Sequence, residues 1–323
     1  MDDTTTSADP AARRARALAS LDGLSTANGY GRQFRRPENW PDGDFPGGLW
    51  TKPVYRPHHT DRFLAAAIEP PGPWQWTDDT GMACDIVAEL VRHNTIDADR
   101  LTTAWTSHFR LPHDHRVATL DMLYGARDGG DWQSLSDRTP DGAGSHGTGA
   151  GMRSAPLGAW FADSLPIVVT RSRAAAELTH RHIDGVAGAV AVAVAAALTA
   201  RHDIPDPAEL VATVVDLTPD SEVKDRLRRI RKLGGTADLV QVAETVGNGR
   251  DRTAASTVPL AIWVAAWQRN DFPRSVRTVV SAGGDMDTTA AIVGGIVAAG
   301  HPDIGVPASW LRTREPLPAW LLP

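Results

Sequence analysis

The sequence predicts an all-α protein, built as a single compact helical domain. Apolar residues recur three and four positions apart along most of the 323-residue chain, which is the spacing of one buried helix face. Two-residue alternation bounded by turns, the pattern of strands, is nearly absent. Neither an internal repeat nor a linker divides the chain. We therefore expect a disordered tail at residues 1–8 and one domain at residues 9–323.

The first helix is expected to begin at Asp9 and Pro10 and to continue through ARRARALASL. Aspartate is a common N-cap, and proline suits the first helical position because the N–H that it lacks would have no helical partner there. Residues 29–60 are dense in Gly, Pro and Trp with almost no periodicity, which predicts a long irregular loop. A second glycine-rich loop is expected at residues 128–151.

Further helices are expected wherever the apolar spacing returns. The ranges are 82–91, 99–109, 117–126, 172–178, 184–200, 207–215, 221–232, 236–246, 258–268, 273–280 and 288–299. The apolar run at 185–198 is too short and too rich in Ala and Gly to span a bilayer, which takes about 20 residues. A buried helix is the favoured interpretation of this run. A strand is the alternative, because Val and Ala alternate in it.

Composition narrows the function classes. Charged residues make up 22% and hydrophobic residues 42% of the chain, as in soluble globular proteins. The formal net charge of -6 argues against non-specific binding to nucleic acid through its phosphates. Cys84, the one cysteine, excludes an intrachain disulfide and a thiolate metal site, and is expected in the core. The N-terminus lacks the apolar core of a signal peptide, so we expect a cytoplasmic protein without membrane contact, although a secreted protein without disulfides stays open.

Two acidic segments stand where helices are expected to begin. The first is WTDDTGM at 76–82 and the second is GGDMDTT at 283–289. Their carboxylate and hydroxyl oxygens are hard ligands, which suit Mg2+, Mn2+ or Ca2+. If the fold brings the segments together, four carboxylates share one space and two divalent cations would balance their charges. The alternative is helix capping, since acidic residues in a first turn complement the helix dipole, but capping requires neither the double Asp nor the Gly-Gly pair.

At these segments the chain resembles the ADP-ribosylglycohydrolase family, which includes dinitrogenase-reductase-activating glycohydrolases and ADP-ribosylarginine and ADP-ribosylserine hydrolases. The signatures of that family look like T-D-D-T and G-G-D-x-D-T. The resemblance implies an all-helical fold with a binuclear Mg2+ or Mn2+ site at helix N-termini. The metal ligands that it implies are Thr77, Asp78, Asp79, Asp285, Asp287 and Thr288.

Weaker segments also resemble the family: GTGAGMRSAPL at 147–157, THRH at 179–182 and VPASWL at 306–311. In the family, backbone amides of the first segment line the ADP-ribose site. The substrate-binding residues expected are Asp22, Ser145, Gly147, Gly149, Gly151, Met152, Arg153, His180 and His182. The residues alone leave alternatives open, because Arg153 fits a phosphate or a structural carboxylate and each histidine fits a structural role. Two roles are open for the tryptophans, which could stack on adenine or bury the loops; they are Trp40, Trp50, Trp74 and Trp76.

The chain departs from the family pattern near its first helix. The family opens with G-D-A-L-G and has a glutamate a few residues later, whereas this chain has LDGLS at 21–25 and Gly29 at the position of the glutamate. Glu38 lies nearby in the sequence and is a candidate to replace the glutamate of the family. Asp114 is the closest match to an aspartate with a base role in other branches. The catalytic residues expected are Asp78, Asp79, Asp287 and Asp114.

The resemblance implies a metal-dependent hydrolase with two divalent cations, Mg2+ or Mn2+. It would cleave the glycosidic bond between ADP-ribose and an acceptor, which is a protein side chain, a nucleobase or a small molecule, and would release ADP-ribose. Nucleic acid is then expected only as a modified substrate. The alternative, motivated by Gly29, is a catalytically weak or inactive relative that binds ADP-ribose or a related nucleotide. The intact acidic motifs favour the enzyme.

Overall fold

The computed structural model describes residues 9–35, 57–109, 117–130, 132, 134, 144–201, 203–300 and 305–322. Within these residues every regular element is a helix, and the strand-like pairings are two isolated bridges, Trp74 with Arg314 and Gly147 with Thr253. The all-α prediction is therefore confirmed. The predictions for the tail at 1–8 and for Glu38, Trp40, Trp50 and Asp114 lie outside the described residues.

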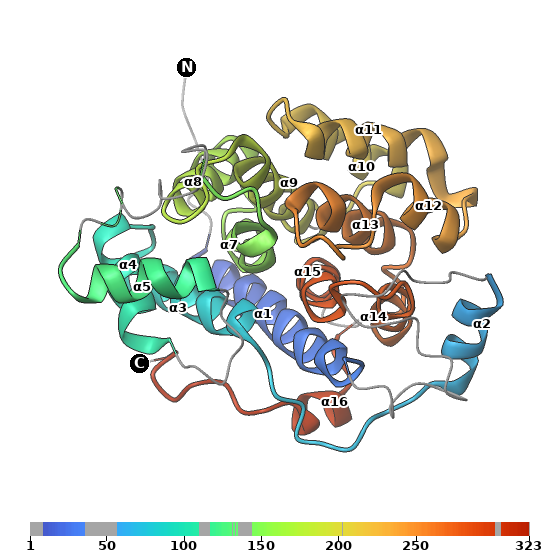
Figure 1. Cartoon of the computed structure of the whole chain (residues 1–323), viewed down its shortest axis with the longest axis horizontal. Helices are drawn as coiled ribbons and strands as arrows, with labels where there is room; N and C mark the ends of the chain where they lie inside the picture. Colours follow the sequence, from blue (N-terminus) through green and yellow to red (C-terminus); the bar gives the residue numbers. More distant parts are fainter. Residues whose placement is uncertain are drawn as a thin grey trace.

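The helices follow one another along the chain in the order that Figure 1 colours from blue to red. Their bounds are α1 Pro10–Gln33, α2 Pro57–Ala66, α3 Asp78–His93, α4 Ala98–His108, α5 Val117–Arg127, η4 Thr148–Arg153, α7 Ala155–Trp160, α8 Leu165–Glu177, α9 Ile183–Thr199, α10 Pro207–Leu217, α11 Glu222–Leu233, η5 Gly234–Thr236, α12 Leu239–Val246, α13 Ala254–Trp267, α14 Phe272–Ser281, α15 Met286–Ala298 and α16 Ala308–Thr313. Both η elements are 3-10 helices.

Helix α1 is longer than the sequence predicted. Residues 29–33, where a loop was expected to begin, are the last residues of α1. Residues 57–60, where that loop was expected to end, are the first residues of α2. The second expected loop, at 128–151, likewise ends inside η4. The physical reason for α1 is burial, since residues 23–31 are all buried and the helix therefore shows no polar face there. Asp9 caps α1 as predicted, because its carboxylate accepts a hydrogen bond from the N–H of Ala11 at 2.9 Å.

Helices α1 and α15 come from opposite ends of the chain and pack side by side at its centre (Figure 1). Their contact is close because glycines face each other. A Cβ atom at Gly23 would lie 2.3 Å from the carbonyl oxygen of Gly294, and one at Gly294 would lie 2.4 Å from the oxygen of Gly23. The C-terminal part of α1 therefore runs beside the start of α15, where the second acidic segment lies.

Helix α9 settles the ambiguity of the apolar run at 185–198. All residues from 185 to 199 are buried in a helix that packs against α7, α8 and α13. The buried-helix interpretation is confirmed and the strand alternative is wrong. Among the described residues, the search for a helix with the length and apolarity of a membrane span finds none. Cys84 has no exposed surface, as expected for a core residue.

Candidate active site

The two acidic segments form the N-termini of α3 and α15. Thr77 is the N-cap of α3, and Asp78 and Asp79 are its first residues. Asp285 is the N-cap of α15. Gly284 has a φ of 72°, and a Cβ atom there would lie 2.2 Å from the carbonyl oxygen of Asn248. The glycine pair thus lets the chain turn into α15 against another backbone segment, which a larger residue would prevent.

Both helix starts open onto one cavity, with about 140 Å³ available to the centres of water molecules. The residues that line it are Arg35, Asp78, Asp79, Met82, Ser145, Gly149, Met152, Arg153, His180, Arg252, Asp285, Asp287 and Thr288. The N-caps Thr77 and Asp285 make no side-chain capping hydrogen bond. The shared cavity is therefore not explained by helix capping alone.

The cavity concentrates negative charge in a buried place. The four aspartates of the two segments are between 1% and 8% exposed. Burial raises the pKa of Asp79 well above its ordinary value, and the charges of Asp78, Asp287 and Asp285 raise it further. Arg35 acts in the opposite direction. The cluster is thus short of positive charge, which is the electrostatic condition under which a divalent cation binds.

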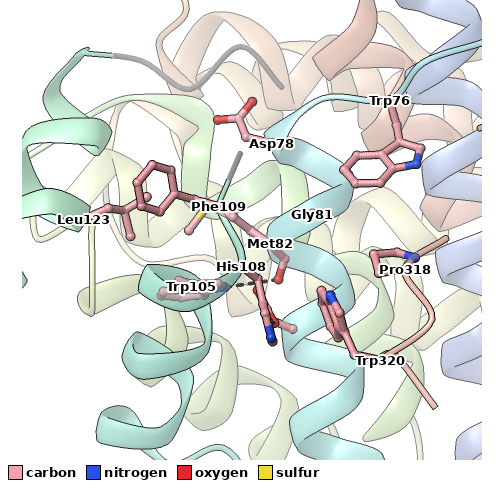
Figure 2. Close-up of a pocket in the computed structure, with 11 residues that line it drawn as sticks. Trp76, Asp78, Gly81, Met82, Trp105, His108, Phe109, Leu123, Pro318 and Trp320 are labelled. Carbon is pink, nitrogen blue, oxygen red and sulfur yellow. Dashed lines mark hydrogen bonds and ion pairs between the residues drawn. The ribbon is translucent and has the colours of Figure 1, made fainter. Parts of the chain in front are cut away.

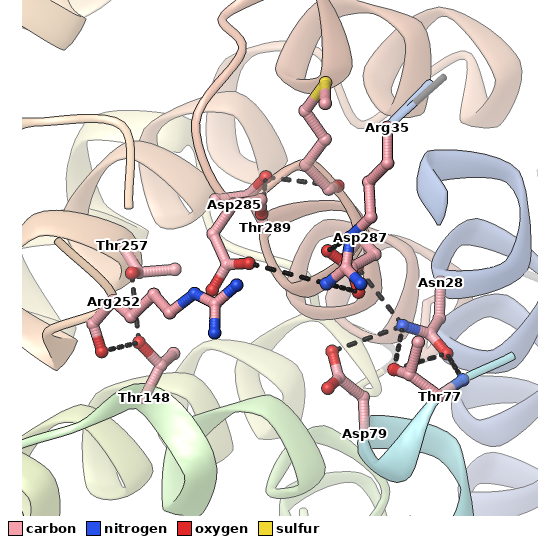
Figure 3. A network of polar contacts seen from close by, with 11 residues as sticks. Asn28, Arg35, Thr77, Asp79, Thr148, Arg252, Thr257, Asp285, Asp287 and Thr289 are labelled. Atoms are coloured by element: carbon pink, nitrogen blue, oxygen red, sulfur yellow. Dashed lines mark hydrogen bonds and ion pairs between the residues drawn. The ribbon is translucent and has the colours of Figure 1, made fainter. Parts of the chain in front are cut away.

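Asn28 connects the two acidic segments and was missed by the sequence analysis. Its side-chain N–H2 donates to Thr77 Oγ1 at 2.9 Å and to Asp79 Oδ2 at 3.2 Å, with a longer contact of 3.5 Å to the carbonyl oxygen of Asp287. Its Oδ1 accepts from the N–H of Thr77 at 2.7 Å and from the hydroxyl of Thr80 at 3.0 Å. The side chain is fully buried (Figure 3). Nothing in the sequence marks this residue, because its partners lie 49 or more positions away.

Arg35, just beyond the end of α1, is the second residue that the sequence analysis missed. Its Nη2 lies 2.6 Å from Asp287 Oδ2, and its Nε lies 3.2 Å from Asp287 Oδ1 (Figure 3). Asp285 Oδ1 is 3.9 Å from the same Nη2. The guanidinium therefore neutralises part of the cluster with a two-pronged ion pair. Arg252 also lines the cavity and points toward Asp285 in Figure 3.

The glycine-rich segment forms another wall of the cavity. Ser145, Gly149, Met152, Arg153 and His180 line it. All five were expected to bind substrate, and that role stays a prediction. A Cβ atom at Gly149 would lie 2.7 Å from His180 Cε1, so the imidazole packs directly across this glycine. His180 Nδ1 is 2.7 Å from Thr179 Oγ1, which orients the ring. Close backbone approach and an oriented imidazole suit a polar ligand in this wall.

Arg153 lines the cavity with a buried side chain. Its side chain is 1% exposed, donates to Thr179 Oγ1 at 2.7 Å and to the carbonyl oxygen of Ala175 at 3.3 Å, and its Cζ lies 4.2 Å from the centre of the Trp105 ring. Burial lowers the pKa of Arg153 to about 9, although Asp78 acts against this. These contacts hold the side chain within the protein. Its binding to a phosphate stays a prediction.

Several residues expected at the substrate site lie elsewhere among the described residues. Asp22 pairs with Arg314 at 3.0 Å. His182 caps α9, accepting from the N–H of Asp184 at 3.1 Å. Gly147 and Gly151, and also Thr77, which was expected as a metal ligand, are close in sequence to the cavity wall but do not line it.

Of the two described tryptophans proposed for adenine stacking, Trp74 is a core residue. It is 1% exposed and packs edge-on against Trp310 with 5.2 Å between ring centres. Trp76 lines a second cavity instead, which Figure 2 shows.

The second cavity adjoins the first, because Asp78 and Met82 line both. Its other walls are largely aromatic, and the space for water centres is about 20 Å³, room for about one water molecule. His108 stacks on Trp320 with 3.9 Å between ring centres, and its Nδ1 is 2.6 Å from Asp85 (Figure 2). Burial raises the pKa of Asp85, while the hydrogen bond and charge of His108 lower it.

The donor set of the first cavity fits hard divalent cations. The two acidic segments contribute carboxylate and hydroxyl oxygens to its lining, which are the ligands that Mg2+ and Mn2+ prefer. Within the described residues, however, no group of three or more His, Cys, Asp or Glu side chains is already arranged around a common metal position. The residues present therefore fit the cations by chemistry, and the aspartate side chains would have to move closer together to coordinate a cation.

Fold and cavity together define a class: within the described residues, an all-helical protein with a buried acidic cavity at two helix N-termini. The ADP-ribosylglycohydrolase family model matches residues 9–322, so the chain belongs to this family. An uncharacterized protein of Archaeoglobus fulgidus is 26% identical over 251 residues, 74% of this chain and 75% of that protein. ADP-ribosylhydrolase ARH3 of Homo sapiens is 25% identical over 276 residues, 74% of each chain. A solved chain of an ADP-ribosylglycohydrolase-related protein complex matches with a TM-score of 0.60 and 22% identity over 94% of this chain and 93% of its own, which shows a shared fold.

Proposed function

We propose that this protein is a metal-dependent hydrolase that cleaves the glycosidic bond between ADP-ribose and an acceptor, releasing ADP-ribose. The observation that carries this proposal is the meeting of both acidic segments at one cavity whose other wall is glycine-rich. Family membership and the name of the relative ARH3 support the bond type. The acceptor is a protein side chain, a nucleobase or a small molecule. The cytoplasmic location stays a prediction from the sequence.

The residues divide the work between charge and position. Asp78, Asp79, Asp285 and Asp287, with the hydroxyl of Thr288, would hold two Mg2+ or Mn2+ ions, which when bound supply an oriented water of lowered pKa. The same carboxylates offset the positive charge that develops on the sugar as the glycosidic bond breaks. Exposed backbone amides around Gly149 suit the pyrophosphate, and His180 is oriented to hydrogen-bond the substrate.

Turnover assays test the proposal directly. We expect hydrolysis of ADP-ribosyl-arginine or ADP-ribosyl-serine that depends on Mg2+ or Mn2+ and stops with chelator. Asp285→Asn should lower kcat by at least about 100-fold, since it removes one carboxylate from the cluster. Asp220→Asn is a matched control, because Asp220 is 89% exposed and lies outside the cavity. Unchanged turnover in Asp285→Asn would eliminate the mechanism.

A second candidate function is binding of ADP-ribose or a related nucleotide without turnover. Gly29 favours it, because a Cβ atom there would lie 2.8 Å from the carbonyl oxygen of Trp74, so α1 offers no room for a glutamate at this position without a shift. The neighbouring residue that reaches the acidic segments is the neutral Asn28. Tight binding of ADP-ribose with no metal-dependent turnover on any ADP-ribosylated substrate would favour this candidate.

A further inference from the structure

Arg35 and Asp287 form the tightest ion pair of the acidic cavity among the described residues. Both oxygens of Asp287 receive hydrogen bonds from the guanidinium, at 2.6 and 3.2 Å. The side chain of Asp287 is 1% exposed whereas that of Arg35 is 28% exposed. The pair thus joins a buried carboxylate to a partly exposed cation that lines the cavity.

Arg35 pairs with the two aspartates of the second acidic segment, Asp285 and Asp287. It lies on the α15 side, bonded to Asp287 and 3.9 Å from Asp285. On the α3 side, Asp79 accepts its hydrogen bond from the neutral amide of Asn28. A divalent cation at the Asp287 oxygens would meet the guanidinium charge at close range, whereas a cation beside Asp78 and Asp79 would not displace the ion pair.

Charge balance leads to the same division. Four carboxylates carry four negative charges, and three arginines, Arg35, Arg153 and Arg252, line the same cavity. One divalent cation already brings the sum of these charges to one positive charge with Arg35 still in place. Two divalent cations with Arg35 in place would give an excess of positive charge in a buried cavity, which is unfavourable.

We propose that Arg35 holds the place of the second divalent cation, so that the two cations bind in sequence and the second one displaces Arg35 from Asp287. The inference rests on the metal-dependent function proposed above. It explains why the described carboxylates converge on one cavity without forming a ready metal cage. Arg35 is accordingly a residue that sets metal occupancy.

Manganese binding to the full-length protein tests this inference without any substrate. Protein stripped with chelator is titrated with Mn2+ by calorimetry and by electron paramagnetic resonance. The wild type should bind one Mn2+ tightly and a second at least about tenfold more weakly, a gap of about 1.4 kcal/mol. In Arg35→Ala the second Mn2+ should bind at least about tenfold more tightly, and a spin-coupled pair signal should appear at two equivalents.

Arg16→Ala is the matched control, because Arg16 lies on α1, the helix that ends shortly before Arg35, has a 20% exposed side chain and pairs with Asp163 at 2.9 Å away from the cavity. It should titrate like the wild type. Arg35→Lys keeps the charge but loses the two-pronged geometry, so its second affinity should fall between those of the wild type and Arg35→Ala. Circular dichroism confirms that each variant is folded, and Arg35→Lys decides the question if Arg35→Ala is not.

Three outcomes overturn the inference, and they are distinguishable. Equal second-site affinity in the wild type, Arg35→Ala and Arg35→Lys overturns the role of Arg35 and leaves the proposed function standing. A wild type that binds both cations with equal affinity does the same. Failure of every variant to bind Mn2+ or Mg2+ overturns both the role of Arg35 and the metal-dependent function.

Discussion

At the scale of single residues, the amide of Asn28 is the joint between the two acidic segments. Asn28→Ala leaves the buried N–H of Thr77 and the hydroxyl of Thr80 without their acceptor. An unsatisfied buried donor costs about 1–3 kcal/mol, so we expect the free energy of unfolding to fall by about 2 kcal/mol or more. Mn2+ affinity should also fall, because Asp79 loses the N–H that positions it. Urea unfolding and Mn2+ titration measure the two effects.

Asn270→Ala is the comparison for this prediction, since Asn270 is exposed and should change stability by no more than about 0.5 kcal/mol. Asn28→Asp separates shape from hydrogen bonding, because it keeps the volume and adds a fifth carboxylate. We expect Asn28→Asp to lose stability as well. Equal stability and Mn2+ affinity in Asn28→Ala and Asn270→Ala would show that Asn28 does not position the cluster.

The site residues that could be predicted from the sequence belong to local patterns, whereas those that could not be predicted depend on distant partners. The aspartates of 78–79 and 285–287 could be predicted because their chemistry is local: paired carboxylates at a helix start form a pattern within a few positions. Asn28 and Arg35 act on partners up to 259 positions away, and each is unremarkable beside its sequence neighbours. Only the packing of α1 against α15 brings them to the cavity.

At the scale of elements, the contact between α1 and α15 depends on glycine. Gly294→Ala would place a methyl group 2.4 Å from the carbonyl oxygen of Gly23, which is backbone and cannot rotate away. We expect the free energy of unfolding to fall by about 3 kcal/mol, measured by urea unfolding. Gly81→Ala is the control, because its Cβ would meet only Trp76 at 3.5 Å, and alanine is the better helix former. Equal stability in both variants would contradict the close packing.

Helix lengths show where sequence patterns stop being informative. Helices α10 and α11 expose one face and bury another, so their spacing was visible and their bounds were predicted to within a few residues. Helix α1 is buried on all sides near its C-terminal end, and α7 and α16 have six residues each, too few to show a period. Such elements are determined by what packs around them.

Asp251 stabilises the turn that places Arg252 at the cavity, and this stabilisation depends on pH. Burial raises the pKa of Asp251, but hydrogen bonds from Ser256 and from the N–H and hydroxyl of Thr253 outweigh it and hold this pKa below its ordinary value. A depressed carboxylate pKa stabilises the fold above the unfolded value and loses this effect as pH falls through the folded value.

Asp251→Asn should therefore be less stable than the wild type at pH 7, by no more than about 1 kcal/mol because water screens this exposed group. The difference should shrink as pH falls below the unfolded pKa of the carboxyl and through its lower folded value. Urea unfolding at several pH values measures it. A difference that stays constant with pH would show that the charge of Asp251 plays no part.

At the scale of the whole molecule, the acidic cavity joins segments from both ends of the chain, so its charge repulsion acts on the entire fold. We predicted one domain from residue 9 to 323, and the packing of α1 against α15 supports one cooperative unfolding transition. Cations that bind the folded form but not the unfolded chain should raise the midpoint of that transition. At Mn2+ concentrations about 100 times the dissociation constant, the gain is about 2.7 kcal/mol, or about 5 °C.

Scanning calorimetry with and without chelator measures this shift, and added NaCl at equal ionic strength separates binding from general screening. Asp287→Asn should be stabilised less by Mn2+ than the wild type. Its metal-free form loses a negative charge and the ion pair between Arg35 and Asp287, and its cavity holds cations less tightly. Its shift with Mn2+ should therefore be at most about half that of the wild type. An equal shift in both proteins would mean that Mn2+ stabilises the fold from somewhere other than the cavity where α3 and α15 begin.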